Sequence, residues 1–380
     1  MAMTGPIARL DDWLRTSFVE HNTLLEEAYF AAGVEVLDDP SLDPHKDAVL
    51  VDGAAHAGAI DAFPDRAAER YEILGMVGYV LGACRRHERE DPELLAPVWD
   101  VARRLGDGLG VAPRYVFAHQ TFFNTARDGR PRTFTALPDE ARFVELNALG
   151  VLGYVRSAAA LRRIPALGVS GPLAGYLLDL AKEALDDVLA FNQRVAREVS
   201  VDRFFRNVRP YFKPHRVGDA VYRGVNAGDF AAINEIDVLT GVCDPRDPFY
   251  ASIVSEKIPY LPPGEHRALR EVGTLDSLLE SFEREAASRV TPQLRENAHR
   301  FLAVCRAHGA AYAFHHTALV KPFIERPAAA LPPERQDSLS ASGPPLDEVI
   351  ALLDRLRALR SDRTPFRRLQ ELVGVAGVSP

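Results

Sequence analysis

Helical periodicity runs through most of this chain, whereas strand signals are weak. Tyr71–Arg86 is apolar almost all round, which predicts a buried helix. Further buried or amphipathic helices are predicted at Pro92–Leu105, Phe143–Leu161, Leu173–Val199, Leu275–Glu285, Leu294–Ile324 and Leu346–Leu359. Alternation at Val221–Val225 supports one short hairpin and no more. These patterns predict an all-α fold.

Composition narrows the partners that such a fold could serve. The net charge is −8 and the chain has no long basic run, so nucleic acid is not expected as a partner. The uncharged run Ile164–Leu178 is too short for a membrane span and contains two prolines. The N-terminus lacks the apolar core of a signal peptide. Three cysteines occur, none in a CxxC pair, and a reducing cytoplasm is the expected compartment.

Histidines are concentrated in the predicted helix Leu294–Ile324. His315 and His316 lie in the stretch AAYAFHHTALVKPFI, and adjacent helical residues point about 100° apart, so one of them can face inward. An imidazole on a helix among apolar side chains is a suitable axial ligand for heme iron. The ordinary alternative is a hydrogen-bonded core histidine. Zinc is disfavoured, because no two histidines of this helix have the i, i+4 spacing and HExxH is absent.

A second segment, FFRNVRPYFKPHRVG (204–218), is rich in arginine and aromatic residues. Arg209 is followed by Pro210, which places it at the end of a helix. There it could bind a substrate carboxylate through two parallel hydrogen bonds, beside an aromatic platform. The alternative is a surface arginine in an ion pair or a helix cap. Motifs for nucleotides, flavins and serine nucleophiles are absent.

Several blocks in a fixed order carry a family resemblance. They read GMVGYVLGACRRHE (75–88), FTALPDEARFVE (134–145), FFRNVRPYFKPHRVG (204–218), VYRG (221–224), DVLTGV (237–242), YLPPGEHR (260–267) and HTALVKPFI (316–324). Over residues 70–360 the chain resembles the heme-dependent family of monodechloroaminopyrrolnitrin synthase, within the indoleamine 2,3-dioxygenase superfamily.

The resemblance implies an all-α heme fold of the indoleamine 2,3-dioxygenase type. It implies a helical heme-binding domain at residues 131–380 and a smaller N-terminal helical region, residues 1–130, over the distal face. The cofactor is expected to be heme b with a proximal histidine. The family's ligand is followed by aliphatic residues at +3 and +4 and by an aliphatic or aromatic residue at +8, which selects His316 as the iron ligand. A one-residue slip would select His315 instead.

The resemblance also assigns the substrate pocket. It maps the substrate-carboxylate arginine onto Arg209 and aromatic pocket positions onto Phe204 and Phe205, with Tyr211 beside them. Asn226 and Gly228 occupy the place of a small distal loop over the heme. The Pro- and Ser-rich segment 326–345 occupies the place of a mobile loop that closes the site, where SASG (340–343) is a loose match. Pro322 is expected to kink the ligand helix.

The function predicted on this basis is a heme-dependent mono- or dioxygenase of secondary metabolism. Its substrate would be an indole or another aromatic, amino-acid-derived small molecule, with O2 or peroxide as co-substrate. No side chain is predicted to act as a general acid or base. The sequence leaves a homodimer open. The alternatives are a non-catalytic heme-binding or sensor protein with the same fold, which would not need the Arg209 anchor, and a helical interaction protein without heme.

Overall fold

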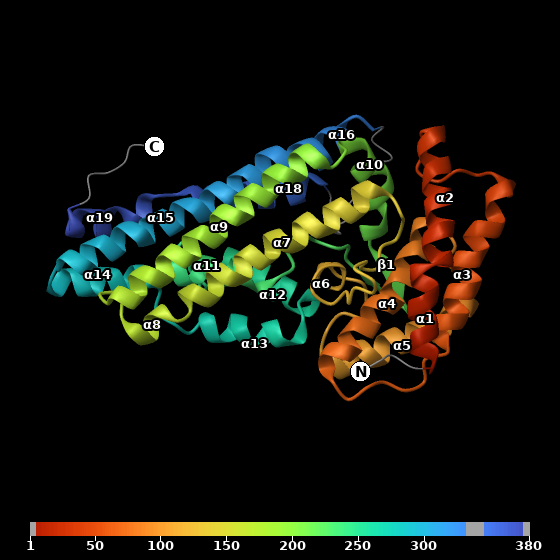
Figure 1. Ribbon diagram of the computed structural model, residues 1–380, viewed down its shortest axis with the longest axis horizontal. Helices are drawn as coiled ribbons and strands as arrows, with labels where there is room; N and C mark the ends of the chain where they lie inside the picture. Colours follow the sequence, from red (N-terminus) through yellow and green to blue (C-terminus); the bar gives the residue numbers. More distant parts are fainter. Residues whose placement is uncertain (1–4, 332–345, 375–380) are drawn as a thin grey trace.

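The computed structural model describes residues 5–331 and 346–374, and helices account for nearly all of their regular structure (Figure 1). Five helices from the N-terminal third gather at one end of the molecule (Figure 1). They are α1 (Gly5–Arg15), α2 (Ser17–Ala32), α3 (Asp43–Gly58), α4 (Ala67–Arg86) and α5 (Pro92–Leu109), with the 3₁₀ turn η1 (Pro40–Leu42) before α3. Helix α4 is almost wholly buried, as its apolar sequence predicts.

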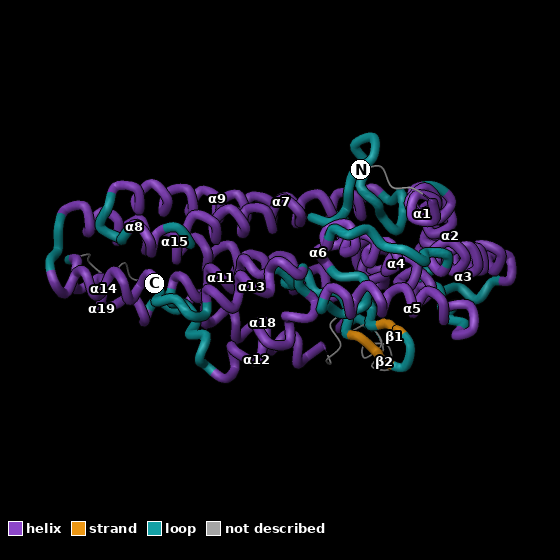
Figure 2. Tube along the Cα trace, turned by 90° about the horizontal axis from the view of Figure 1, so that it is seen from below, coloured by secondary structure: helices purple, strands orange, loops and turns teal. Residues whose placement is uncertain are grey.

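Three long helices run side by side through the rest of the molecule (Figures 1 and 2). They are α7 (Pro138–Leu161), α9 (Pro172–Glu198) and α15 (Pro292–Phe314); α9 packs against both of the others. Gly153 allows the close approach of α7 to α9, because a Cβ there would lie 2.6 Å from the side chain of Val188. This layer supplies one wall of the main cavity described below.

Shorter elements complete the fold. The α-helices are α6 (Phe117–Gln120), α8 (Ile164–Leu167), α10 (Val201–Arg203), α11 (Ala231–Thr240), α12 (Pro248–Lys257), α13 (Pro263–Val272), α14 (Leu278–Ser288), α16 (Arg326–Ala329), α18 (Leu346–Ser361) and α19 (Arg367–Val373). Two π-helices, η2 (Phe204–Val208) and η5 (His315–Glu325), and three 3₁₀ turns, η3 (Arg209–Phe212), η4 (Ile258–Tyr260) and η7 (Thr364–Phe366), interrupt them.

The predicted all-α class is confirmed, with two local differences. The hairpin lies earlier than predicted: β1 (His215–Val217) pairs antiparallel with β2 (Ala220–Tyr222) (Figure 2). The helix predicted over Leu294–Ile324 is α-helical only to Phe314 and continues as η5. Pro322 has no N–H to give to an α-helical ladder, and it lies within the π-helix η5; the kink expected there stays a prediction.

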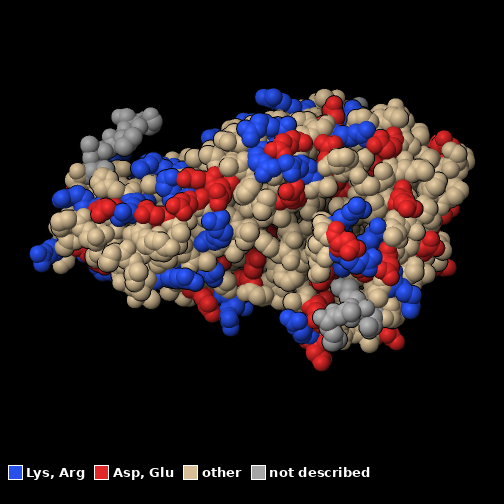
Figure 3. All heavy atoms as spheres, viewed as in Figure 1, with Lys and Arg blue, Asp and Glu red and all other residues tan. Residues whose placement is uncertain are grey.

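The described residues also bear on the expectations about a membrane span, surface charge and the loop 326–345. Among the described residues, no helix has the length and apolar character needed to cross a bilayer. Acidic and basic side chains are interspersed on the face shown in Figure 3. Residues 332–345, most of the predicted loop 326–345 with its SASG match, lie outside the described residues. The domain boundary expected after residue 130 stays a prediction.

Candidate functional site

A cavity of about 260 Å³ lies between η5, the α7–α9 layer, the η2–η3 segment, α11 and α18. Its walls are mainly apolar, with Phe143, Phe204, Phe230, Leu319 and Phe323 among them. Three cationic side chains also line it, and no described lining residue is acidic. Such a cavity excludes water around most of a ligand while offering positive charge at a few points.

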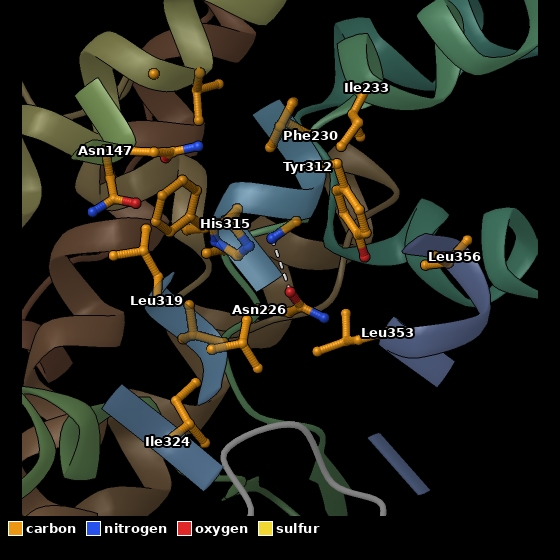
Figure 4. A pocket seen from close by; sticks show the side chains of 18 of the residues that line it. Asn147, Asn226, Phe230, Ile233, Tyr312, His315, Leu319, Ile324, Leu353 and Leu356 are labelled. Carbon is orange, nitrogen blue, oxygen red and sulfur yellow. Dashed lines mark hydrogen bonds between the residues drawn. The ribbon is translucent and has the colours of Figure 1, made fainter. Parts of the chain in front are cut away.

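His315 faces this cavity and His316 does not. His315 is a lining residue and stands near the centre of the view in Figure 4, between Asn147 and Tyr312. No described residue hydrogen bonds to its ring, whose neighbour is the Tyr312 ring at a centroid distance of 6.4 Å. Burial, followed by the charges of His316 and Arg360, lowers the pKa of His315 to about 4. The imidazole is therefore neutral at neutral pH.

His316 is turned toward helix α18 instead. Its Nε2 lies 3.6 Å from Oδ1 of Asp354, and neither ring nitrogen has a hydrogen-bond partner among the described residues. The residue is only 1% exposed and is absent from the cavity wall. The π-helical turn that begins at His315 decides which of the two adjacent rings reaches the cavity, and residue spacing alone could not reveal this.

Arg209 enters the same cavity from another wall. The π-helix η2 ends at Val208, so Arg209 begins the turn η3 with Pro210, as the sequence predicted for a helix end. The guanidinium is 5.6 Å from the Phe205 ring centroid and forms no ion pair or hydrogen bond with a described residue. Burial lowers the pKa of Arg209 to about 10, so the group remains charged. A buried cation without a partner is costly, which favours an anionic ligand here.

Of the three predicted aromatic pocket residues, only Phe204 lines the cavity. Phe204 lines the cavity and meets the Phe323 ring edge-on at 5.8 Å. Phe205 lies under Arg209 and packs against Ala328, outside the cavity lining. Tyr211 is fully buried behind the wall, where it stacks on Phe134 at 4.2 Å and donates a hydrogen bond to Asn22.

Asn226 and Gly228 both line the cavity, and their predicted role in substrate binding stays a prediction. The Asn226 Oδ1 atom accepts a hydrogen bond of 2.8 Å from the Gly228 amide, the dashed line in Figure 4. A Cβ at Gly228 would lie 3.2 Å from that same oxygen, so glycine suits this tight turn. Arg223 and Asp229 form a bidentate ion pair across the segment 224–228, which contains this turn.

A buried polar network behind the cavity was not foreseen. Asp237 of α11 accepts hydrogen bonds from His308 Nε2 at 2.7 Å, from Arg360 at 2.6 and 2.9 Å, and from Tyr250 at 2.8 Å. Arg360 in turn lies 4.2 Å from the ring centroid of Tyr312, and both line the cavity. One signal could have revealed the network, since a carboxylate within the apolar run of α11 requires buried partners.

A second network ties the N-terminal helices to η2. The Arg86 guanidinium binds the Glu26 carboxylate through two bonds of 2.7 and 2.9 Å, and both side chains are buried. Asn207 of η2 donates to the same carboxylate at 2.9 Å, and Arg86 also donates to the carbonyl of Arg206. The N-terminal helices therefore position the segment that presents Phe204 and Arg209.

Fold and cavity together define an all-α protein of the indoleamine 2,3-dioxygenase-like class. The family model of monodechloroaminopyrrolnitrin synthase PrnB matches residues 4–372, nearly the whole chain. The chain belongs to this family, as its sequence blocks predicted. The family implies a heme-dependent oxygenase of secondary metabolism.

The residues present fit a heme. His315 offers a neutral ring with no competing hydrogen-bond partner, in a cavity whose walls are mainly apolar. Those features are what an axial ligand and a porphyrin face require.

Proposed function

We propose that this protein is a heme-dependent oxygenase whose substrate is an indole or another aromatic, amino-acid-derived molecule bearing a carboxylate. One observation carries the proposal. The described cavity is lined both by an imidazole without a hydrogen-bond partner, His315, and by a guanidinium without an acidic partner, Arg209. When bound, heme supplies an iron that activates dioxygen or peroxide.

His315, rather than His316, is the proposed iron ligand. The family pattern at +3, +4 and +8 pointed to His316, but His315 lines the cavity and His316 does not, which favours His315. His316 faces Asp354 on the other side of the helix. A ligand must direct a lone pair into the space where the metal lies, and among the two only His315 borders that space.

The rest of the cavity orients substrate. Arg209 binds the carboxylate, and charge-assisted bidentate bonds hold both its position and its angle. Phe204 and Phe212 supply an aromatic wall for a ring. Apolar side chains exclude water, which strengthens the ion pair at Arg209. A non-catalytic heme carrier would not need such a carboxylate anchor.

The ligand assignment is tested by the visible spectrum of the protein from heme-supplemented cells, ferric and then reduced under carbon monoxide. His315→Gly should lose the Soret band of a histidine-ligated heme, and added imidazole should restore it. His316→Gly is the matched control and should keep the band without imidazole. The reverse pattern would move the ligand to His316, and a wild-type protein that never binds hemin would refute the proposed function.

Substrate anchoring is tested by comparing tryptophan with tryptamine, which lacks the carboxylate, as binding probes. Arg209→Ala should weaken tryptophan binding by about ten-fold or more, the effect of one charge-assisted interaction, and leave tryptamine binding nearly unchanged. Arg206→Ala is the control, because Arg206 is exposed on the same segment. Equal losses for both probes would contradict the role.

A further inference from the structure

Lys257, the last residue of α12, reaches the cavity with its charge unmatched. Its Nζ donates a 2.6 Å hydrogen bond to Oδ1 of Asn234 and lies 6.0 Å from the ring centroid of Phe230. No described carboxylate forms an ion pair with it. The nearby Asp229 is bound to Arg223, and Asp237 is bound to Arg360. Burial, which outweighs the nearby charges of Asp229 and Asp237, lowers the pKa of Lys257 to about 8.

The cavity is therefore lined by two cationic side chains, Arg209 and Lys257, that form no ion pair with a described residue. Arg360, the third cation of its lining, is neutralised by Asp237 through two hydrogen bonds. Arg209 and Lys257 have no such counter-ion among the described residues. A single substrate carboxylate would satisfy one of them, so the second indicates a further acidic group in the bound state.

Lys257 and Arg209 reach the cavity from different elements, the end of α12 and the turn η3. Lys257 lies beside Phe230, which appears with Ile233 on the far side of His315 from Ile324 in Figure 4. Arg209 lies over Phe205, whose packing partner Ala328 belongs to α16, just beyond η5.

Contacts also tie Lys257 to the wall that carries His315. Asn234, which accepts from Lys257, donates to the Tyr250 hydroxyl at 2.9 Å, and Tyr250 donates to Asp237. Through Arg360 this chain of contacts reaches Tyr312, the ring neighbour of His315. Arg209 comes from the turn η3, outside this chain of contacts. An anion at Lys257 thus belongs to whatever His315 binds, rather than to the substrate.

We propose that Lys257 binds a propionate carboxylate of the heme held by His315, leaving Arg209 for the carboxylate of the substrate. This inference rests on the proposed heme function. The propionate carboxylates of a heme lie at the periphery of its ring, and Lys257 is the lining residue that would bind one of them. Asn234 orients the ammonium for that contact.

The test measures the release of hemin from the reconstituted full-length protein to an excess of apomyoglobin. Lys257→Met should accelerate hemin release by about ten-fold or more, because one charge-assisted interaction is lost. Lys257→Arg should retain most of the slow release, since the charge remains. Lys182→Met, a change in an exposed lysine of α9, is the control and should release hemin at the wild-type rate.

Hemin dimethyl ester makes the test specific, because both of its carboxylates are masked. The wild-type protein should release the ester faster than hemin, and Lys257→Met should change ester release little. An equal acceleration for hemin and ester would make Lys257 a structural residue and overturn the inference. Unchanged hemin release with weakened tryptophan binding would assign Lys257 to the substrate and also overturn it.

These outcomes separate the inference from the proposed function. A wild-type protein with a histidine-ligated heme spectrum but no dependence on Lys257 refutes only the propionate contact. A wild-type protein that gives no such spectrum refutes the heme function itself, and the inference with it.

Discussion

The cavity has two walls that are built alike and differ in what supports them. One wall is the π-helix η5, which begins at His315, and the other is the π-helix η2, which is followed directly by Arg209. Each is adjacent to a buried network around one carboxylate: Asp237 behind η5 and Glu26 behind η2. π-Helical turns concentrate at functional sites because they turn a side chain away from its α-helical direction.

The difference lies in where each carboxylate comes from. Asp237 belongs to α11 and binds residues of α15 and α18, so the η5 wall is held from within the C-terminal part of the chain. Gly309 of α15 permits this, because a Cβ there would lie 2.6 Å from the carbonyl of Arg360. Glu26 belongs to α2, so the η2 wall is held by the N-terminal helices. We infer that the η5 wall and the η2 wall can be weakened separately.

The largest loss of stability is expected from Asp237→Asn, which breaks the network behind η5. It would leave Arg360 buried without its counter-ion and weaken the bond from His308, at a cost of about 3–5 kcal/mol in the free energy of unfolding. Urea unfolding of the apoprotein measures this cost. Hemin release should also accelerate, because the network contacts Tyr312 beside His315. A loss below about 1 kcal/mol would show that the network is not a support.

The ion pair between Asp237 and Arg360 also predicts that the free energy of unfolding depends on pH. Burial alone would raise the pKa of Asp237, but the Arg360 guanidinium and the His308 bond hold it well below its usual range. A lowered carboxylate pKa stabilises the fold above the ordinary value of about 3.9, and that stability is lost as the pH falls below it. The difference in unfolding free energy between wild type and Asp237→Asn should therefore shrink from pH 6 toward pH 3. A constant difference would contradict the ion-pair account.

A smaller effect is expected from Glu26→Gln, the corresponding isosteric change behind the η2 wall. Arg86 keeps its hydrogen bonds to the carbonyls of Glu35 and Arg206, so we expect a loss of about 3 kcal/mol, at the lower end for a broken buried ion pair. The substrate side should respond, with weaker tryptophan binding at an unchanged rate of hemin release. If hemin release changes as much as it does in Asp237→Asn, the two walls are not separate.

The smallest effect is expected from Arg209→Lys. The charge stays, but two parallel hydrogen bonds cannot form from an ammonium, so tryptophan binding should weaken by roughly ten-fold or less. Protein stability should change little, because Arg209 has no ion-pair partner in the described structure. Isothermal titration with tryptophan and tryptamine measures the effect. A loss as large as that of Arg209→Ala would mean that geometry rather than charge dominates the contact.

Much of the architecture could be predicted from local pattern. The long apolar and amphipathic stretches became α4, α7, α9 and α15, because helical periodicity is a property of neighbouring residues. Arg209 was also recognisable, since Pro210 ends the helix before it and its aromatic surroundings are contiguous in sequence. The candidates for the iron ligand could likewise be narrowed to two adjacent residues, His315 and His316.

Other parts of the site depend on distant segments. Lys257 looks like any surface lysine in its own sequence, and only the approach of α12 to α11 desolvates it beside Asn234. Arg360 and Asp237 are 123 residues apart, and neither local sequence predicts their contact. Phe205 and Tyr211 share the aromatic segment with Phe204, yet packing turns them away from the cavity.

The sequence by itself determined that this chain is helical, that it belongs to a heme oxygenase family and that a histidine pair and one arginine are its candidate site residues. Such conclusions rest on periodicity, residue type and residue order, which are properties of the linear sequence. Only the tertiary structure decided that His315 rather than His316 borders the cavity, and that Lys257 lines it without a counter-ion among the described residues. The reason is physical: a π-helical turn sets the direction of a side chain, and burial by remote helices sets its charge balance.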